Sequence, residues 1–136
     1  MSSVIQSSIL VIQTVGWEVL LLKRAPFLRH FPNMYCFPGG KRDGKESDFG
    51  TAIRETQEET GLLFEEKDLT CSGYESLVFP DGVRFIMAAC HLRTRIPAPL
   101  PVTLSEEHTE YLWIRHDKAL ELDLAGPFTR SVLERL

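Results

Sequence analysis

The stretch Gly40–Leu62 constrains this chain more than any other part of it, because it predicts a helix with a defined start and a defined end. Ser47 or Asp48 can cap the start of this helix. The helix then runs to about Thr60, where Gly61 supplies a C-terminal stop. At about 100° per residue, one side of the helix is suited to packing against a sheet. That side carries Phe49, Ile53, Thr56 and Thr60.

A second face of the predicted helix carries three carboxylates, those of Glu55, Glu58 and Glu59. Two carboxylates about 6 Å apart repel each other by roughly 3 kcal/mol at an effective dielectric constant of about 20. Arg54 relieves only part of this repulsion. A hard divalent cation would relieve the rest, and an all-oxygen site suits Mg²⁺ or Mn²⁺. Taken alone, an acidic cluster of this kind is more often a solvated helix face, so the spacing of the whole stretch has to decide.

That spacing resembles the Nudix box, G-x5-E-x7-R-E-U-x-E-E-x-G-U, in which U is a bulky aliphatic residue. Seven positions of the pattern are fixed and all seven match; they are Gly40, Glu46, Arg54, Glu55, Glu58, Glu59 and Gly61. With residue frequencies of about 7%, a chance match is on the order of 10⁻⁸ per starting position. Thr56 departs from the pattern at an aliphatic position, but it lies on the sheet-facing side of the helix and therefore affects packing rather than the acidic face.

The resemblance implies a metal site on this helix. In Nudix hydrolases the glutamates that match Glu55, Glu58 and Glu59 bind a divalent metal. The backbone carbonyl that matches Gly40 often joins them. Mg²⁺ (or Mn²⁺) is therefore the expected cofactor.

Hydrolysis of a phosphoanhydride also needs a group that accepts the proton of the attacking water. Glu58 or Glu59 could accept it. Arg54 resembles the family's arginine that orients neighbouring carboxylates, and it would act here through Glu46 or Glu55. Arg54 is therefore included among the expected catalytic residues.

Family members often supply a further carboxylate from a loop before a late strand. The segment Ser105–Trp113 resembles an E-H-x-x-Y-x-W pattern found in several of them, and Glu107 is the preferred candidate, with Glu110 and Glu106 behind it. The alternative is that these are exposed loop acids. Within the same segment, we interpret His108 as a structural or substrate-edge residue and the tryptophan as core packing rather than a platform for a base.

Basic residues near the box are candidates for the substrate's phosphates, because guanidinium groups match phosphate in a bidentate manner. Arg24 lies at a predicted strand end and Lys41 lies beside Gly40, which favours both of them. Arg29 is either a third phosphate ligand or a solvated side chain. Three aromatic residues of a later predicted hairpin could stack on a base or pack in the core; they are Tyr74, Phe79 and Phe85.

The substrate class stays open. Leu21–Gly40 resembles the segment before the box in the coenzyme A pyrophosphatase branch, and Arg54–Gly61 resembles the diadenosine tetraphosphate hydrolases. Nucleoside triphosphates, dinucleoside polyphosphates, nucleotide sugars and coenzyme A are all compatible. The expected function is a metal-dependent pyrophosphohydrolase that uses water to cleave a nucleoside diphosphate linked to another moiety. The alternatives are a catalytically silent Nudix-fold nucleotide-binding or sensor module, and an unrelated α/β domain with a glutamate-rich helix.

The rest of the chain predicts a mixed sheet with helices on its faces, and the resemblance narrows this to fold class α/β (α+β), a Nudix-type α/β/α sandwich, in a single domain over residues 1–136. Val4–Val15 and Trp17–Lys23 predict strands that pair as a hairpin. The other expected elements are an extended piece at Met34–Phe37, ended by Pro38-Gly39-Gly40; a polar loop at Lys41–Glu46; a long hairpin of Leu69–Phe79 and Val83–Thr94; a loop at Arg95–Pro101; a strand at His108–Ile114; and helices at Asp117–Leu122 and Pro127–Leu136.

Composition limits the partners. The chain has 136 residues and a formal net charge of −4, which argues against a duplex nucleic-acid binder. The apolar run Ile9–Ile12 is too short to span a bilayer and no basic residue precedes it, so no membrane partner and a cytoplasmic location are expected. Cys36, Cys71 and Cys90 are interpreted as reduced thiols. A homodimer is expected only by analogy with relatives.

Overall fold

The computed structural model describes residues 3–136, so Met1 and Ser2 of the predicted domain lie outside the described residues. The strands are β1 (Val4–Val11), β2 (Glu18–Arg24), β3 (Tyr35–Cys36), β4 (Gly39–Lys41), β5 (Leu69–Val78), β6 (Arg84–Leu92) and β7 (His108–Arg115). The helices are α1 (Asp48–Thr60), α2 (His116–Ala119) and α3 (Gly126–Glu134), with a 3₁₀ turn η1 at Glu66–Asp68.

The strands form two sheets, each with buried strands at its centre. In the first, β1 is antiparallel to β4 and parallel to β6, and β5 lies at the edge. In the second, β2 lies between β3 and β7 and is antiparallel to both. Alternate residues of β1 enter different core layers, because Ile9 and Val11 belong to one hydrophobic cluster and Leu10 to the other. This alternation follows from the two-residue period of a strand.

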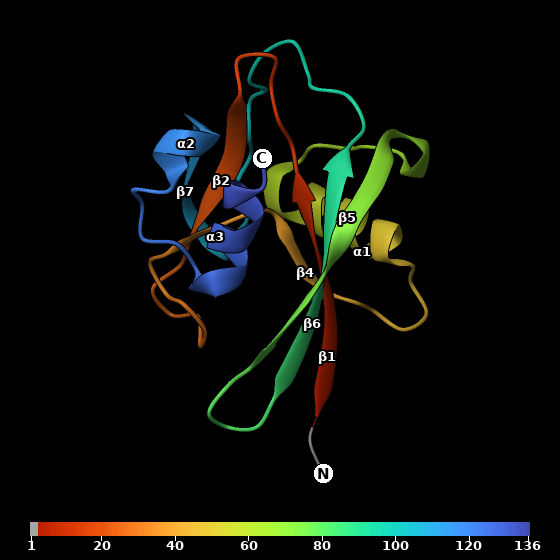
Figure 1. Cartoon of the computed structure of the whole chain (residues 1–136), viewed down its shortest axis with the longest axis vertical. Coiled ribbons are helices and arrows are strands. Elements are labelled where there is room, and N and C mark those ends of the chain that lie inside the picture. The colour runs from red at the N-terminus through yellow and green to blue at the C-terminus, as the bar shows by residue number, and fades with distance from the viewer. Residues whose placement is uncertain (1–2) are drawn as a thin grey trace.

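Helices cover both outer sides of the sheets (Figure 1). Ala52 of α1 packs in the cluster that contains Leu10 and Leu20, whereas Phe128 and Val132 of α3 pack in the other cluster. These layers confirm the predicted α/β/α sandwich. Its strands are divided between a mixed sheet and an antiparallel sheet.

The predicted hairpin between the first two strands is wrong beyond its turn. The chain does reverse here, since the Thr14 N–H donates to the Glu18 carbonyl at 2.8 Å and Leu20 donates to Ile12 at 3.2 Å. β1 and β2 then diverge into different sheets. The second half of β1 and the centre of β2 are apolar and buried on both faces, so each strand needs a strand neighbour on either side. Those neighbours are β4 and β6 for β1, and β3 and β7 for β2.

The glycines before α1 are also placed differently from the prediction. Gly39–Lys41 was expected to be a stop followed by a loop, but it forms strand β4, in which Gly40 lies opposite Ser8 of β1. A β-carbon at Gly39 would overlap the Ser8 backbone, so glycine lets the two strands approach. The helix that follows confirms the prediction: Ser47 Oγ accepts from the Gly50 N–H, and Gly61 ends the helix at φ 77°.

The long hairpin of β5 and β6 is confirmed, and it extends with the start of β1 away from the helices toward the N-terminus (Figure 1). The final two helices lie where they were predicted, although α2 ends earlier, at Ala119. Among residues 3–136, the helices are all too short or too polar to cross a membrane.

Candidate active site

A cavity of about 450 Å³ opens beside α1 and β4, which is within the usual size range of ligand pockets, roughly 300–1,000 Å³. Three carboxylates line it: Glu55 and Glu59 from α1, and Glu107 from the loop before β7. Arg24 and Lys41 line the same cavity. Acidic and basic side chains from distant parts of the chain are therefore brought together at one opening.

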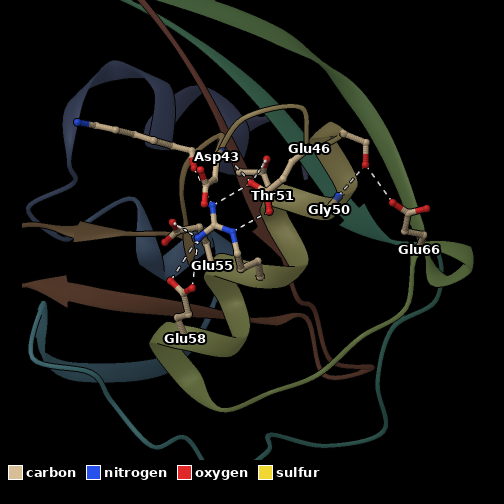
Figure 2. A network of polar contacts seen from close by, with 10 residues as sticks. Asp43, Glu46, Gly50, Thr51, Glu55, Glu58 and Glu66 are labelled. Carbon is tan, nitrogen blue, oxygen red and sulfur yellow. Dashed lines mark hydrogen bonds and ion pairs between the residues drawn. The ribbon is translucent and has the colours of Figure 1, made fainter.

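Arg54 makes hydrogen bonds to two carboxylates of the α1 face and to Glu46 in the loop before it. Its Nε and Nη2 donate to the two oxygens of Glu46 at 2.7 and 2.9 Å. Its Nη1 donates to Glu55 at 3.0 Å and to Glu58 at 3.3 Å, and its Nη2 also reaches the Lys41 carbonyl at 3.0 Å. Figure 2 shows Glu46, Glu55 and Glu58 converging on this one guanidinium. The contacts match those predicted for Arg54; its orienting role stays a prediction.

Glu46 accepts more hydrogen bonds than the other carboxylates that contact Arg54. It also accepts from the Asp43 N–H at 2.8 Å and from Thr51 Oγ1 at 3.2 Å, which ties the loop before α1 to the first turn of the helix. The hydrogen bond from Arg54 is the main reason that the pKa of Glu46 is lowered to about 2. Glu46 is therefore held ionised, as a structural anchor for the guanidinium.

Glu59 is in a different environment from the rest of the acidic face, because only 4% of it is exposed. Burial raises the pKa of Glu59 well above its usual range; the hydrogen bond from Gly39 N–H opposes this, and the nearby Glu55 and Glu107 charges add to it. That N–H donates to Glu59 Oε1 at 2.9 Å. Burial also raises the pKa of Glu55, although Arg54 counteracts it. Two partly desolvated carboxylates thus share one cavity wall.

Gly40 brings backbone directly against Glu55. A β-carbon at Gly40 would lie 2.5 Å from the Glu55 carboxyl carbon and 2.6 Å from its Oε2. Any other residue would push this carboxylate out of its position. The fixed glycine of the box is therefore explained by the close approach of β4 to the acidic face.

The acidic face fits a cation by its chemistry. Among residues 3–136, no three His, Cys, Asp or Glu side chains are already arranged as a metal site. Glu58 is 58% exposed and contacts Arg54, and Glu59 contacts Gly39. All the donors are oxygens, as Mg²⁺ and Mn²⁺ prefer. The raised pKa values of Glu55 and Glu59, both caused first by burial, are what a bound cation would reverse.

The loop before β7 places one of its three candidate acids at the cavity. Glu107 lines the cavity, and its carbonyl accepts from the Ala25 N–H at 2.8 Å. Glu110 instead pairs with Lys23 at 3.2 Å on the neighbouring strand. The preference for Glu107 over Glu110 therefore agrees with position, and its role as a base stays a prediction.

The three predicted phosphate ligands differ in their contacts. Arg24 Nε donates to the His30 carbonyl at 2.8 Å. Within the described part of the chain, neither Arg24 nor Lys41 is paired with an acidic side chain, so both are available to an anion. Arg29 also lines the cavity, but its guanidinium is paired with Asp81 at 2.9 Å. That partner was not foreseen.

His108 and Trp113 have the structural roles that were expected. His108 is 5% exposed, with Nε2 at 3.9 Å from Cys36 Sγ, and its Nδ1 has no hydrogen-bond partner among the described residues. Trp113 packs against the core on the α1 side and donates from Nε1 to the Leu100 carbonyl at 3.0 Å. Neither residue is among those that line the cavity.

His108 makes a testable contribution to pH-dependent stability. Burial, and secondly the charge of Arg24, lowers the pKa of His108 to about 4. A histidine with a lowered pKa stabilises the fold fully above its ordinary pKa of about 6.5, and that stability is lost as pH falls toward 4. We expect a loss of about 3 kcal/mol over this interval from His108 alone. Urea unfolding of His108→Gln should show a flatter dependence, and an equal slope in both proteins would contradict the assignment; His116→Gln is the control.

Sequence reasoning missed one wall of the cavity. Phe79 and Phe85 were considered, and both line it, whereas Tyr74 lies elsewhere and donates to Asp48 at 2.6 Å. The side chains that were not singled out are Leu28, His30, Phe31, Leu77, Met87 and Phe128. The signal available was the aromatic-rich segment between the second and third strands, residues 25–34.

Comparison with known proteins agrees with this geometry. Residues 5–136 match the family model of the NUDIX domain, and the chain therefore belongs to the Nudix family. The crystal structure of a MutT protein from Methanosarcina mazei has a TM-score of 0.84 and 28% sequence identity, covering 98% of this chain and 93% of that one. Both results confirm the resemblance and the fold predicted from residues 40–62.

Two curated relatives illustrate how broad the family is. An asymmetrical bis(5'-nucleosyl)-tetraphosphatase of Rattus norvegicus is 32% identical over 110 residues, which is 77% of this chain and 69% of the relative. An m7GpppN-mRNA hydrolase of Xenopus laevis is 36% identical over 70 residues, which is 52% of this chain and 24% of the relative. The matches to this Xenopus laevis protein and to two further relatives, from Caenorhabditis elegans and Mus musculus, span only 17–24% of the lengths of those relatives. The subfamily is not defined by these similarities.

Proposed function

We propose that this chain is a metal-dependent pyrophosphohydrolase that cleaves a phosphoanhydride bond in a nucleoside diphosphate linked to another moiety, with water as the nucleophile. The observation that carries the proposal is one cavity that Glu55, Glu59 and Glu107 share with Arg24 and Lys41, which form no ion pair among residues 3–136. Hydrolysis of a diphosphate requires both kinds of group: basic side chains bind the phosphate oxygens, and carboxylates bind the metal and accept the proton of the attacking water. The Rattus norvegicus relative is a bis(5'-nucleosyl)-tetraphosphatase and the Xenopus laevis relative an m7GpppN-mRNA hydrolase, which supports a nucleotide derivative as the substrate.

The proposed ligands of Mg²⁺ or Mn²⁺ are Glu55, Glu58, Glu59 and the Gly40 carbonyl. When bound, such a metal supplies neutralisation of phosphate charge and a lower pKa for water. Glu58 would have to turn from Arg54 toward the cavity, which its exposed position permits. Arg54 would remain on Glu46, so that Glu55 keeps its orientation.

Glu107 is our proposed proton acceptor. It faces Glu55 and Glu59 closely enough for its charge to raise the pKa of both carboxyls, after the larger effect of burial. It comes from a different element than the proposed metal ligands, so it is free of the Gly39 and Arg54 hydrogen bonds that hold them. Glu58 and Glu59 remain alternative acceptors. Arg24 and Lys41 are proposed to bind the phosphates, and Arg29 is the third candidate.

Substrate and setting are proposed only in broad terms. Nucleoside triphosphates, dinucleoside polyphosphates, nucleotide sugars and coenzyme A are all candidates. We propose a cytoplasmic protein acting on a small molecule, without a duplex nucleic-acid or membrane partner, and a homodimer by analogy. The second candidate function, a silent nucleotide sensor, is disfavoured because every fixed position of the Nudix box is present.

The test is a hydrolysis screen of these four substrate classes at about pH 8, with Mg²⁺, Mn²⁺ or a chelator. We expect product only with metal, because the carboxylates repel the anionic substrate without it. Glu58→Gln should reduce the rate by roughly 100-fold, since several kcal/mol of charge stabilisation depend on the metal. Glu110→Gln is the matched control, as that glutamate pairs with Lys23 away from the cavity.

Two outcomes would reject the proposal. Turnover in the presence of chelator, or undiminished turnover in Glu58→Gln, would remove the metal assignment. Thermal stabilisation by a nucleotide without any product would favour the sensor instead.

A further inference from the structure

The cavity has a second wall that the proposed chemistry does not use. Its members are apolar or aromatic and come from three regions: Leu28 and Phe31, Leu77, Phe79 and Phe85, and Phe128. The acidic face and the basic residues line the same cavity, so a ligand held by its diphosphate there would extend along this wall. The chemistry of the wall therefore bears on what the diphosphate is attached to.

Two of the rings that form this wall come from segments far apart in the sequence. His30 belongs to the loop of residues 25–34, and Phe79 to the turn of residues 79–83 between β5 and β6. Their rings stack with centroids 4.5 Å apart and planes 26° apart. Phe85 meets Phe79 edge-on at 5.0 Å. Burial, and secondly the charge of Arg29, lowers the pKa of His30, so a neutral imidazole is presented to the stack.

The 25–34 loop is fixed at its base. Arg24 closes the loop through its backbone, donating to Met34 at 2.9 Å and accepting from Asn33 at 2.9 Å, and its side chain donates to the His30 carbonyl at 2.8 Å. Phe31 has φ 52°, an outlier for a bulky residue. A β-carbon at Gly126 would lie 2.9 Å from the Phe31 ring. The ring positions are thus determined by the fold before any ligand arrives.

One ion pair joins the tip of this loop to the β5–β6 turn. Arg29 Nη2 lies 2.9 Å from Asp81 Oδ2. The other oxygen of Asp81 accepts from the Val83 N–H at 3.0 Å, so the turn itself orients the carboxylate. Arg29 is 77% exposed, and an exposed pair is weak and sensitive to salt. Its removal is therefore not expected to disturb the core.

We propose that the 25–34 loop and the β5–β6 turn together form one aromatic wall that binds a planar aromatic group of the substrate from the cavity side, and that the Arg29–Asp81 pair keeps the two segments of this wall together. This inference rests on the proposed function, which places the diphosphate at the acidic end of the cavity. His30, Phe79 and Phe85 would bind the group by stacking and shape, because the wall offers rings and few hydrogen-bonding groups. They would favour a flat base over a sugar at this position.

The test compares two probes that share a diphosphate but differ in the ring. ADP carries an adenine and inorganic pyrophosphate does not. Calorimetry with Mg²⁺ should give wild-type protein a tighter Kd for ADP than for pyrophosphate. Phe79→Leu should weaken ADP binding by roughly tenfold, as expected for the loss of a stacking ring, and leave pyrophosphate unchanged. Arg130→Gln, at an exposed arginine of α3, is the control.

The ion pair is tested separately, at exposed positions where folding is not at risk. Asp81→Asn should weaken the binding of ADP by several-fold and leave the binding of pyrophosphate unchanged. Added salt should reduce the ADP preference of the wild type but not that of Asp81→Asn. The proposal would be overturned if Phe79→Leu weakened the binding of ADP and of pyrophosphate equally, or if the wild type bound ADP no more tightly than pyrophosphate. Binding of ADP without pyrophosphate would instead count against the diphosphate end, and binding of neither against both.

Discussion

Replacing Glu59 with glutamine is expected to remove hydrolysis while leaving the protein at least as stable as the wild type. Glu59 is proposed to bind the metal, and several kcal/mol of charge stabilisation depend on that ion, so the rate should fall by roughly 10²–10³-fold. The stability of the fold depends less on the Glu59 carboxylate than activity does. Glutamine keeps the oxygen that accepts from Gly39 N–H and removes a charge that is almost fully buried.

The pH dependence distinguishes this account from simple damage. Because burial raises the pKa of Glu59, the folded state holds this proton more tightly than the unfolded chain. The wild type should therefore lose stability as pH rises from the ordinary glutamate pKa, about 4.3, toward the raised value. Glu59→Gln should lack this loss.

The measurements are metal-free urea unfolding at several pH values and a rate assay with Mg²⁺. Glu121→Gln, at an exposed glutamate after α2, is the control. Activity above a tenth of wild type would remove Glu59 from the metal site. A strongly destabilised variant would mean that the fold itself requires the charge.

Local signals explain which parts of the fold were predictable. The helix α1 was placed correctly because its start and its end are each signalled by a residue directly beside them: Ser47 caps the start and Gly61 ends the helix. The pairing of β1 and β2 was not, because adjacent apolar strands suggest a hairpin whatever partners lie further along the chain. The neighbours with the longest pairings, β6 for β1 and β7 for β2, begin only at Arg84 and His108.

The site residues also fall into those that local spacing could predict and those that depend on contacts distant in the sequence. Spacing along one helix placed Glu55, Glu58 and Glu59 on one face, but it does not say which part of that face another strand covers. β4 contacts Glu59 and leaves Glu58 in solvent. Arg29 was considered either a phosphate ligand or a solvated side chain, and its partner Asp81, 52 residues away in the sequence, was not foreseen. Contacts of that separation leave no pattern within a local window.

Replacing Arg54 with lysine is expected to be nearly as damaging to activity as losing a metal ligand, although the charge is kept. The guanidinium binds both oxygens of Glu46 and also reaches Glu55, Glu58 and the Lys41 carbonyl. An ammonium group is a point charge that cannot hold this set of positions together. We expect activity to fall by roughly 10–100-fold, as for other residues that orient metal ligands, and the free energy of unfolding to fall by about 2 kcal/mol.

The free energy of unfolding below about pH 4.3, here called the acid limb, gives an independent readout. Arg54 is the main cause of the lowered pKa of Glu46, about 2. A lowered carboxyl pKa stabilises the fold above the ordinary value, near 4.3, and this contribution is lost as pH falls toward 2. Arg54→Lys should flatten that acid limb, whereas Arg130→Lys should not. If Arg54→Lys kept both wild-type activity and the wild-type loss of stability in acid, a positive charge at this position would be sufficient without the guanidinium geometry. The acidic face would then be positioned by its own backbone.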